Sequence, residues 1–422
     1  MTQGRRRVLS ALAACGALGA IGLAWWRSRP GPVLPAPQPT RRPWQPQGGR
    51  VVGAAWDLVG IVGTGQSLAV GVEGTPVLSS KPAFGNLKLA LGGAAVPPFD
   101  PAARELALVP LSEPIRPPGR RYPEGYPGNI RGETPHSAMA HQISTLARAR
   151  LGRDCVTVHS VVGESGQAMA VIGRDATPRV ESGLAWAAGL FEVQAIARLA
   201  AAAGKSYGVG AVVLTHGESD AERKSYAAEL LRLWQDYNAD LSALTGQRQT
   251  LPLLLTQQHS TPMLAGSISE SALAAWRVAT EQAGDVVCVG PKYQYRYAED
   301  QVHLTALSYA RLGEKYGQVF FQHVLLDQPF RPLQPLGVER QASQLLVRFF
   351  VPVPPLTWDE SLPLPHQDAL REWHQGRGFE VVSRGERVPI VGVRLLGPDL
   401  VGIELAADAP RELELRYALA AG

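Results

Sequence analysis

Two short segments, far apart in the sequence, carry the residue types of nucleophilic catalysis. Ser67 lies in Gly-Gln-Ser-Leu, after an apolar run over 57–63 that predicts a buried strand ending in glycines. Asp300 and His303 are three positions apart, just ahead of a segment with a helical pattern. A serine hydroxyl needs a base to accept its proton, and that base needs a partner to fix its tautomer. Together the segments predict acyl transfer through a covalent serine intermediate.

Two further segments lie between them, each at the end of a predicted strand. The run over 156–162 is followed by Gly-Glu-Ser-Gly at 163–166, and the run over 210–215 by His-Gly-Glu-Ser-Asp at 216–220. With these four segments in order, the chain resembles the SGNH (GDSL-type) hydrolases over residues 56–325. The Gly-Gln-Ser variant resembles their carbohydrate-esterase branch, which includes sialate and xylan O-acetylesterases.

The resemblance implies a fold, a set of roles and an activity. The fold is the flavodoxin-like SGNH-hydrolase architecture, a three-layer α/β/α sandwich with a parallel sheet. Ser67 is then the nucleophile, His303 the base and Asp300 its orienting acid, and Gly166 gives a backbone N–H to the oxyanion hole. The expected activity is that of a serine carboxylic-ester hydrolase acting on O-acylated carbohydrate, without a cofactor.

The third segment departs from the family pattern. The family has asparagine as an oxyanion donor where this chain has Ser219, and the acetylesterase branch commonly has glutamine where this chain has His216. Each such donor stabilises the transition state by roughly 3–4 kcal/mol. We expect His216 to supply the third donor through a ring N–H, with Ser219 as the weaker candidate. In the alternative interpretation His216 and Glu218 form a hydrogen-bonded pair that braces the strand end. Gln66 and Glu218 are further candidates for oxyanion or substrate binding.

The elements around these segments alternate between strand and helix patterns, as a parallel sheet with crossover helices requires. Strands are predicted near 57–63, 155–162, 209–215, 251–256 and 285–290. Helices are predicted near 136–150, 184–203, 221–244, 269–283 and 304–324. Ligands of such sheets bind beyond the carboxyl ends of the strands. All four chemical segments fall there, so the strand pattern itself predicts one common site.

Other polar residues are candidates for the same face of the sheet. Residues 92–133 form a long irregular stretch, and stretches of this length are often functional. It carries side chains suited to stacking on and hydrogen bonding to a sugar ring: Arg120, Arg121, Tyr122, Tyr126, Asn129 and Glu133. The alternative is a structural excursion over the sheet edge. Gln257, Gln258 and His259 follow the fourth strand, and His259 is a rival base without a neighbouring acid.

The N-terminus predicts export. Three arginines at 5–7 precede an uncharged run from Val8 to Trp26, close to the roughly 20 residues of a membrane-spanning helix. We interpret residues 1–28 as a retained signal anchor of a bacterial cell-envelope protein. A twin-arginine signal and a lipoprotein box ending at Cys15 remain alternatives. The proline-rich segment 29–50 is typical of an extended linker.

Composition limits the other possibilities. Of the 422 residues 45% are hydrophobic and 18% charged, which indicates a packed protein, and a net charge of +4 gives little support to nucleic-acid binding. Cys155 and Cys288 lie in apolar runs and are expected to be buried thiols. No cluster has metal-ligand spacing, so no metal is expected.

The pattern changes after about residue 328. Short runs of alternating polarity between turn residues predict a small antiparallel β-sandwich over 336–422, after a catalytic domain over 51–327. This module is expected either to bind glycan or to cover an edge of the catalytic domain.

Two other functions remain open besides the esterase. They are a polysaccharide O-acyltransferase and a catalytically weak relative that binds glycan.

Overall fold

The structure is a computed structural model, and it describes residues 44–91, 97–116, 132–179, 182–258, 268–360, 376–406 and 409–419. The predicted anchor over 1–28 lies outside these residues, as do Cys15 and most of the 29–50 linker. Within the described ranges, no helix has the length and apolar character needed to cross a membrane.

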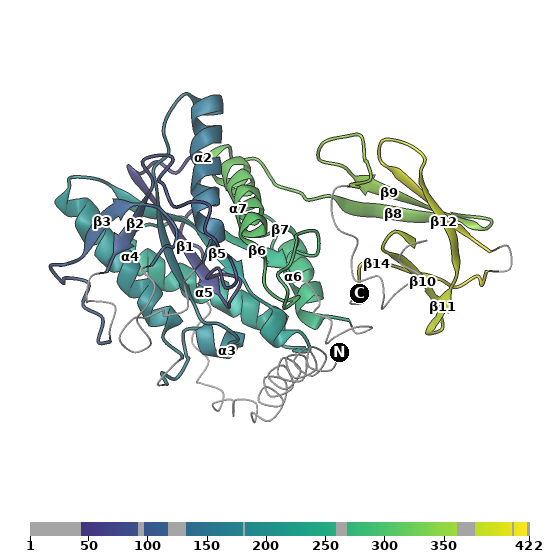
Figure 1. Ribbon diagram of the computed structural model, residues 1–422, viewed down its shortest axis with the longest axis horizontal. Helices are drawn as coiled ribbons and strands as arrows, with labels where there is room; N and C mark the ends of the chain where they lie inside the picture. The colour runs from purple at the N-terminus through teal and green to yellow at the C-terminus, as the bar shows by residue number, and fades with distance from the viewer. Residues whose placement is uncertain are drawn as a thin grey trace, which may run out of the picture. The chain divides into compact units, whose positions relative to one another are not determined.

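A mostly parallel sheet forms the centre of the larger, N-terminal part of the described chain (Figure 1). In the described part of the chain it has seven strands in the order β3-β2-β4-β1-β5-β6-β7. All neighbours pair in parallel except β2 and β3, which pair antiparallel at one edge. The strands are β1 (Leu58–Gly65), β2 (Leu87–Ala90), β3 (Ala107–Pro110), β4 (Thr157–Gly163), β5 (Tyr207–Thr215), β6 (Leu253–Gln257) and β7 (Val286–Pro291).

The central strand β1 is buried along its whole length. It pairs with β4 on one side and β5 on the other, and helices cover both faces of the sheet. A strand covered on both faces reads as a continuous apolar run instead of an alternating one, which is the pattern of residues 58–63. The predicted α/β architecture with a parallel sheet is confirmed.

The helices form two layers. α2 packs against α7, whereas α4 packs against α5 and α5 against α6. Their bounds are α2 (Pro135–Leu151), α4 (Ala185–Ala202), α5 (Tyr226–Thr245), α6 (Glu270–Glu281) and α7 (Ala306–Phe320), and a short α3 (Met169–Ile172) follows β4. The five long helices lie within a few residues of the predicted ones.

Local sequence signals set several helix ends. α2 starts with Pro135 after the N-cap Thr134, whose hydroxyl accepts a hydrogen bond from the His136 N–H. It ends at Gly152, which adopts the left-handed conformation that closes a helix. Thr305 caps α7 in the same way as Thr134 caps α2, by accepting from a backbone N–H of the first turn. The start of α7 is therefore fixed directly after His303.

The C-terminal part consists of two antiparallel sheets, with strand orders β12-β13-β9-β8 and β11-β10-β14 among the described residues. The strands are β8 (Gln334–Gln341), β9 (Gln344–Phe350), β10 (Phe379–Ser383), β11 (Glu386–Val388), β12 (Ile390–Leu395), β13 (Leu400–Leu405) and β14 (Glu414–Tyr417). They enclose a core of their own, which includes Val347, Val381 and Ile403. The antiparallel C-terminal module expected from the alternating runs is therefore present.

Three strands lie where no strand was predicted. β2 and β3 fall in or next to the stretch taken as irregular, and each has only four residues at the sheet edge. β8 begins at Gln334, two residues ahead of the predicted module over 336–422. Seven of its eight residues are exposed, so the strand has no alternating pattern to reveal it.

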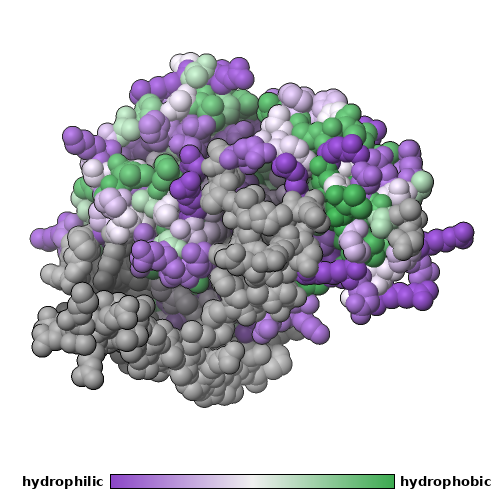
Figure 2. Space-filling model, turned by 45° about the vertical axis from the view of Figure 1, so that its right-hand side comes forward, coloured by the Kyte–Doolittle hydropathy of each residue, from purple (hydrophilic) through white to green (hydrophobic). Residues whose placement is uncertain are grey.

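The surface has no uniform character over the face seen in Figure 2. Hydrophobic residues lie there in small groups among hydrophilic ones.

Both cysteines of the described residues, Cys155 and Cys288, are buried and unpaired. Burial raises the pKa of each thiol to about 11, which leaves them inert as nucleophiles.

Candidate active site

Strand register brings the first three chemical segments together. Gly65 at the end of β1 pairs with Gly163 of β4 on one side and with Thr215 of β5 on the other. Ser67, Gly166 and His216 therefore all follow the carboxyl ends of three adjacent strands. The approach is close, since a Cβ atom on Gly65 would lie 2.1 Å from the Thr215 carbonyl oxygen, and its φ is +141°. Glycine is required at this position.

The nucleophile candidate lies in a tight turn. The Ser67 carbonyl accepts hydrogen bonds from the backbone N–H groups of Val70 and Val72, each at 3.2 Å. Ser67 is only 4% exposed, and no hydrogen bond of the described residues occupies its own N–H. The turn thus holds the serine rigidly and leaves its backbone donor free.

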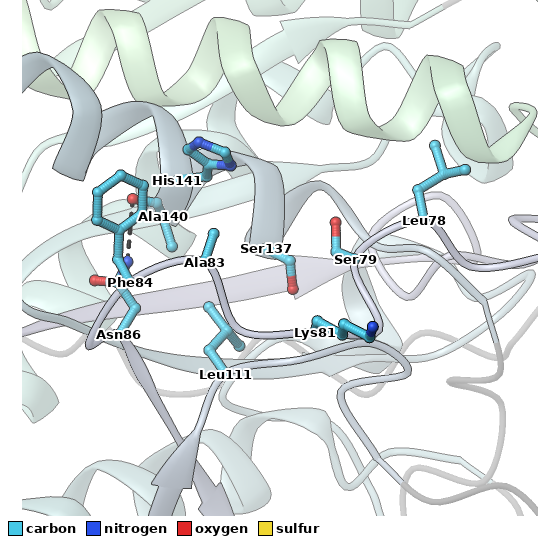
Figure 3. A pocket seen from close by; sticks show the side chains of 10 residues that line it. All are labelled: Leu78, Ser79, Lys81, Ala83, Phe84, Asn86, Leu111, Ser137, Ala140 and His141. Carbon is cyan, nitrogen blue, oxygen red and sulfur yellow. Dashed lines mark hydrogen bonds between the residues drawn. The ribbon is translucent and has the colours of Figure 1, made fainter.

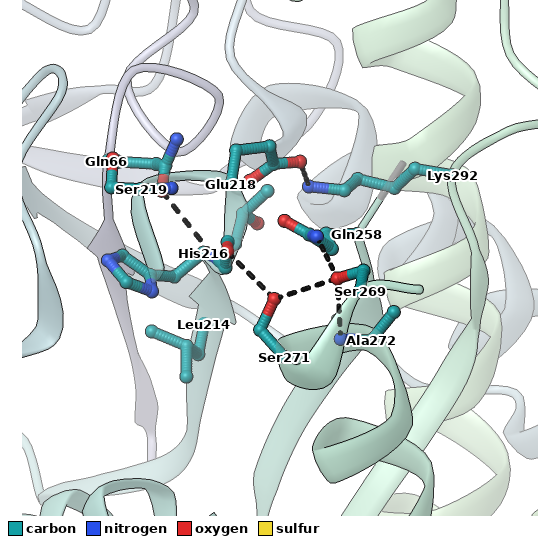
Figure 4. A network of polar contacts seen from close by, with 12 residues as sticks. Gln66, Leu214, His216, Glu218, Ser219, Gln258, Ser269, Ser271, Ala272 and Lys292 are labelled. Carbon is teal, nitrogen blue, oxygen red and sulfur yellow. Dashed lines mark hydrogen bonds and ion pairs between the residues drawn. The ribbon is translucent and has the colours of Figure 1, made fainter. Parts of the chain in front are cut away.

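Gln66 connects this turn to the third segment. Its Oε1 accepts hydrogen bonds from the backbone N–H groups of Gly217 at 3.3 Å and Ser219 at 3.2 Å (Figure 4). Two donors aimed at one oxygen fix the orientation of the amide, because the opposite flip would place donors against donors. The Gln66 Nε2 therefore carries two N–H groups that have no partner among the described residues.

His216 is engaged through both ring nitrogens. Its Nδ1 lies 3.0 Å from the Tyr226 hydroxyl and its Nε2 lies 3.0 Å from the Gln167 carbonyl oxygen. A carbonyl only accepts, so Nε2 donates to Gln167 and Nδ1 accepts from Tyr226. Burial lowers the pKa of His216, which keeps the ring neutral. His216 thus does not form the predicted pair with Glu218, and its contacts use the N–H that an oxyanion would need.

The second segment is held by its glutamate. The Glu164 carboxylate accepts from the backbone N–H groups of Gly183 and Leu184, both at 2.7 Å, and of Ala185 at 3.0 Å. These are orphan donors at the start of α4, so the carboxylate caps that helix. Two residues later Gly166 is exposed, with φ of +68°. Its N–H has no partner among the described residues.

Asp300 and His303 form a closely joined pair. The Asp300 Oδ2 lies 2.5 Å from the His303 Nδ1, and its Oδ1 accepts from the backbone N–H groups of His303 and Val302 at 2.9 and 3.0 Å. Partial burial raises the pKa of Asp300, but these hydrogen bonds outweigh that effect and the net pKa is lowered. An ionised Asp300 fixes the proton of His303 on Nδ1, so Nε2 is left as a base.

Lys292 belongs to none of the four predicted segments, yet it supplies a positive charge that pairs with Glu218 of the third segment. Its side chain is fully buried, and its Nζ lies 2.5 Å from the Glu218 Oε1 (Figure 4). The second carboxylate oxygen, Oε2, is buried without a partner among the described residues. Lys292 follows β7 and its carbonyl accepts from the Tyr297 hydroxyl at 3.2 Å. The ion pair thus joins the third segment to the loop that carries His303.

The helix after His303 also contacts the serine turn. The Tyr309 hydroxyl of α7 donates to the Val72 carbonyl at 2.8 Å. β1 and β7 are separated in the sheet by β5 and β6, and this hydrogen bond joins the helix that follows His303 to the turn that follows β1. Neither Tyr309 nor Val72 belongs to a recognisable motif, and the helical stripe of α7 gives the only signal of its burial.

The remaining predicted residues divide into two groups. Glu133 binds the backbone N–H groups of Leu78 and Ser79 and therefore has a structural role in the chain near β2. Gln257 donates to the Ala272 carbonyl, and the Gln258 Nε2 donates to the Ser269 hydroxyl. The Gln258 Oε1 is buried without a partner among the described residues. Outside the described residues lie Arg120, Arg121, Tyr122, Tyr126, Asn129 and His259.

A separate cavity of about 170 Å³ lies beside α2, between that helix and the segment before β2 (Figure 3). It is lined by Leu78, Ser79, Lys81, Ala83, Phe84, Asn86, Leu111, Ser137, Ala140 and His141. None of the residues of the four chemical segments borders it. Among the described residues, no group of His, Cys, Asp or Glu side chains is arranged to hold a metal ion.

Comparison with known proteins gives one family and several solved structures. The family described as "Carbohydrate esterase, sialic acid-specific acetylesterase" matches residues 181–322, which contain the third and fourth chemical segments. No protein in the curated set that was compared matches the chain. The family match confirms the predicted resemblance to the carbohydrate-esterase branch, whose members are carboxylic-ester hydrolases.

Among solved structures, a carbohydrate acetylesterase from Xanthomonas citri has 11% sequence identity and a TM-score of 0.51, over 86% of this chain and 75% of that chain. A protein from Arabidopsis thaliana has 17% identity and a TM-score of 0.44, over 63% of this chain and 98% of its own. A carbohydrate acetylesterase from Sinorhizobium meliloti has 13% identity and a TM-score of 0.31, over 62% and 97%. At such identities the Xanthomonas structure shows a shared fold.

Proposed function

We propose that this protein is a serine esterase that removes O-acetyl or other short acyl groups from carbohydrate through Ser67, His303 and Asp300. The observation that carries the proposal is the Asp300–His303 pair, in which the carboxylate occupies Nδ1 and leaves Nε2 to act as the base. The register that places Ser67 between the second and third segments supports it. The matched family supplies the substrate class, an acetylated carbohydrate.

The reaction has two acyl-transfer steps. His303 accepts the Ser67 proton while Oγ attacks the ester carbonyl, and the imidazolium then protonates the departing sugar alcohol. A water molecule repeats the sequence on the acyl-enzyme and releases the carboxylic acid. Asp300 stays ionised throughout and stabilises the imidazolium that forms in each step.

Three donors are assigned to the oxyanion. Two are the backbone N–H groups of Ser67 and Gly166, which have no partner among the described residues. The third is the Gln66 Nε2, because the Gly217 and Ser219 N–H groups hold its oxygen and turn its nitrogen outward. His216 is left out of this set, since both of its ring nitrogens are occupied. A donor held in place before the reaction costs no reorganisation when charge develops.

The setting of the enzyme follows from its sequence. We assign residues 51–327 to catalysis and 336–422 to an accessory module, behind a proline-rich linker over 29–50 and an export or anchor segment over 1–28. This places the esterase outside the cytoplasm in the cell envelope of a bacterium. O-acylated polysaccharide is the substrate that such a location offers.

The experiment that tests the function uses the parent protein and the variants Ser67→Ala, His303→Ala and Asp300→Asn. Acetate release is followed from p-nitrophenyl acetate and from a panel of O-acetylated glycans, and the sugar products are identified by mass spectrometry. We expect turnover by the parent, a loss of at least about 1,000-fold in kcat for each of the first two variants, and a large loss for Asp300→Asn.

Two results would change this assignment. Transfer of the acetyl group to a second sugar, without free acetate, would replace the esterase by an acyltransferase. Glycan binding by a folded parent that turns over no ester, and whose Ser67 does not react with a fluorophosphonate, would identify a binding protein.

A further inference from the structure

Tyr309 is rigidly attached to the same element as the proposed base. It lies in the first turn of α7, and its N–H donates to the carbonyl of the N-cap Thr305 at 3.0 Å. The helix begins three residues after His303, whose carbonyl accepts from the Ala298 N–H at 2.7 Å. Tyr309 is completely buried, so its ring is fixed by packing. A displacement of α7 would therefore move His303 and the Tyr309 hydroxyl together.

The hydroxyl of Tyr309 reaches the turn that holds the proposed nucleophile. It donates to the Val72 carbonyl at 2.8 Å, while the Val72 N–H donates to the Ser67 carbonyl at 3.2 Å. Two consecutive hydrogen bonds thus connect α7 to the backbone of Ser67. Among the described residues, no other hydrogen bond joins α7 to the turn over 66–72.

The surroundings of this hydroxyl keep it a donor. Burial, and then the negative charges of Glu218, Asp300 and Glu73, raise the pKa of Tyr309 far above its ordinary value. Of these residues, Glu218 belongs to the third segment, Asp300 belongs to the fourth, and Glu73 directly follows the turn over 66–72. The phenol therefore stays protonated at any pH at which the enzyme works, and its bond to Val72 does not vary with pH.

We propose that Tyr309 is a positioning residue for the esterase reaction, because its hydroxyl sets the distance and angle between the Ser67 turn and His303. This inference rests on the proposed function, in which His303 takes the Ser67 proton. Its physical basis is the sensitivity of proton transfer to geometry. A misplacement of about 1 Å, far from the reacting atoms, costs on the order of 100-fold in rate.

Tyr316 offers a matched control from the same helix. It is also completely buried, and its hydroxyl is likewise bonded to backbone, at 3.3 Å from the Leu214 carbonyl, and to the Thr215 hydroxyl at 3.0 Å. These partners belong to β5, so the Tyr316 hydroxyl bonds directly to the sheet, whereas the Tyr309 hydroxyl bonds directly to the serine turn. Replacing either tyrosine by phenylalanine removes one buried hydroxyl and leaves a carbonyl partner behind.

The test compares Tyr309→Phe and Tyr316→Phe in the full chain, with melting temperature, kcat and KM measured on p-nitrophenyl acetate and the best glycan ester. Titration with a fluorophosphonate counts the folded active sites, so partial unfolding does not enter kcat. We expect similar melting temperatures for the two variants. We expect kcat to fall about 10- to 100-fold in Tyr309→Phe with KM within about twofold, and to fall less than about threefold in Tyr316→Phe.

Equal values of kcat in the two variants would overturn the positioning role of Tyr309, whether both are high or both are low. So would a loss in Tyr309→Phe that appears in KM instead of kcat. Ser67→Ala and His303→Ala are measured alongside. If these two variants keep the parent's activity, the proposed function fails; if they are inactive and the two phenylalanine variants agree, only the inference about Tyr309 fails.

Discussion

Gln66 illustrates how neighbouring backbone groups can give a side chain its chemical direction. Its amide oxygen is held by two N–H groups, so its nitrogen is the part left for a ligand. We expect Gln66→Glu to keep the acceptor and the fold but to lose the donor and add negative charge beside the oxyanion. The predicted fall in kcat is at least about 100-fold.

The control for this prediction is Ser219→Ala, which removes a hydroxyl at the family's asparagine position and keeps the N–H that binds Gln66. We expect less than a roughly tenfold fall in kcat for that variant, since one weak donor is lost. A fall in Ser219→Ala that equals the one in Gln66→Glu would assign the third donor to Ser219 instead.

The Glu218–Lys292 pair makes a second prediction at the level of single residues. Both side chains are buried, so removing one partner leaves an uncompensated charge, at a cost of about 3–5 kcal/mol in the free energy of unfolding. We expect such a loss in Glu218→Leu and in Lys292→Met, and a much smaller one in the double variant that combines these two substitutions. Urea unfolding measures all three. Losses that add up in the double variant would show that the two charges do not compensate each other.

Motif order is sufficient to name Ser67, Asp300 and His303 as candidates, because each follows a predicted strand in a set pattern. Lys292 was not predictable in this way. Lysine is almost always exposed, and its partner Glu218 is 74 positions earlier in the chain, so only the fold shows that the two charges meet. The role of His216 likewise depends on Tyr226 and Gln167, neither of which lies in a motif.

At the scale of elements, prediction succeeded where burial leaves a periodic or continuous apolar pattern. β1, β4, β5, β6 and β7 are such strands, and the long helices carry apolar stripes. Of these helices, α2, α6 and α7 also begin at residues whose side chains cap them. β2 and β3 are too short to show a period, and β8 is exposed on nearly all positions. These elements take their form from pairing with a neighbouring strand, which local sequence does not record.

The contact between α2 and α7 carries a prediction of its own. A Cβ on Gly313 of α7 would lie 2.1 Å from the Pro135 carbonyl oxygen at the start of α2. Alanine normally favours a helix by about 1 kcal/mol over glycine, but backbone cannot yield here as a flexible side chain would. We therefore expect Gly313→Ala to lose about 1–3 kcal/mol of stability through overpacking, with a lower melting temperature.

Gly392→Ala in β12 is the matched control, because a Cβ there meets no atom within 4 Å. Its melting temperature should equal that of the parent or exceed it. A stabilised Gly313→Ala would mean that α2 and α7 are less closely packed than the structure shows.

At the scale of the whole molecule, the chain has more than one hydrophobic core. The largest forms around the central sheet and its helices, and the C-terminal sheets enclose another whose members include Leu345, Phe379 and Val401. The sequence change after residue 328 marks this division, because alternating runs replace the strand–helix pattern there. Composition alone distinguishes a packed protein from a disordered one but does not separate the two cores.

Stability of the whole fold should depend on pH through Glu113. Burial, with a smaller effect of Glu133, raises the pKa of its carboxyl to about 7, although Thr134 and Ser137 donate to it. Between about pH 4.5 and 7 the folded state therefore binds more protons than the unfolded state, so stability falls as pH rises through this window. We expect the free energy of unfolding of Glu113→Gln, relative to that of the parent, to increase by roughly 3 kcal/mol from pH 4 to pH 8.

Chemical denaturation at several pH values measures this difference. Burial lowers the pKa of His136 to about 3, so His136 makes stability rise with pH. This contribution is the same in both proteins and cancels when they are compared. If the free energies of unfolding of the parent and of Glu113→Gln change in parallel with pH, then Glu113 ionises in the folded protein as it does in the unfolded chain.

The central position of β1 has a consequence for how the protein becomes active during synthesis. Gly65 must pair with Gly163 and Thr215, and His303 lies further along still. Contacts between residues so distant in sequence are slow to form, because the entropy cost of closing a long loop comes before the contacts can stabilise the fold. A nascent chain therefore carries Ser67 long before it has an oxyanion hole or a base. In the proposed mechanism Ser67 therefore has no base to activate it until His303 and α7 have been synthesised and have folded against the sheet.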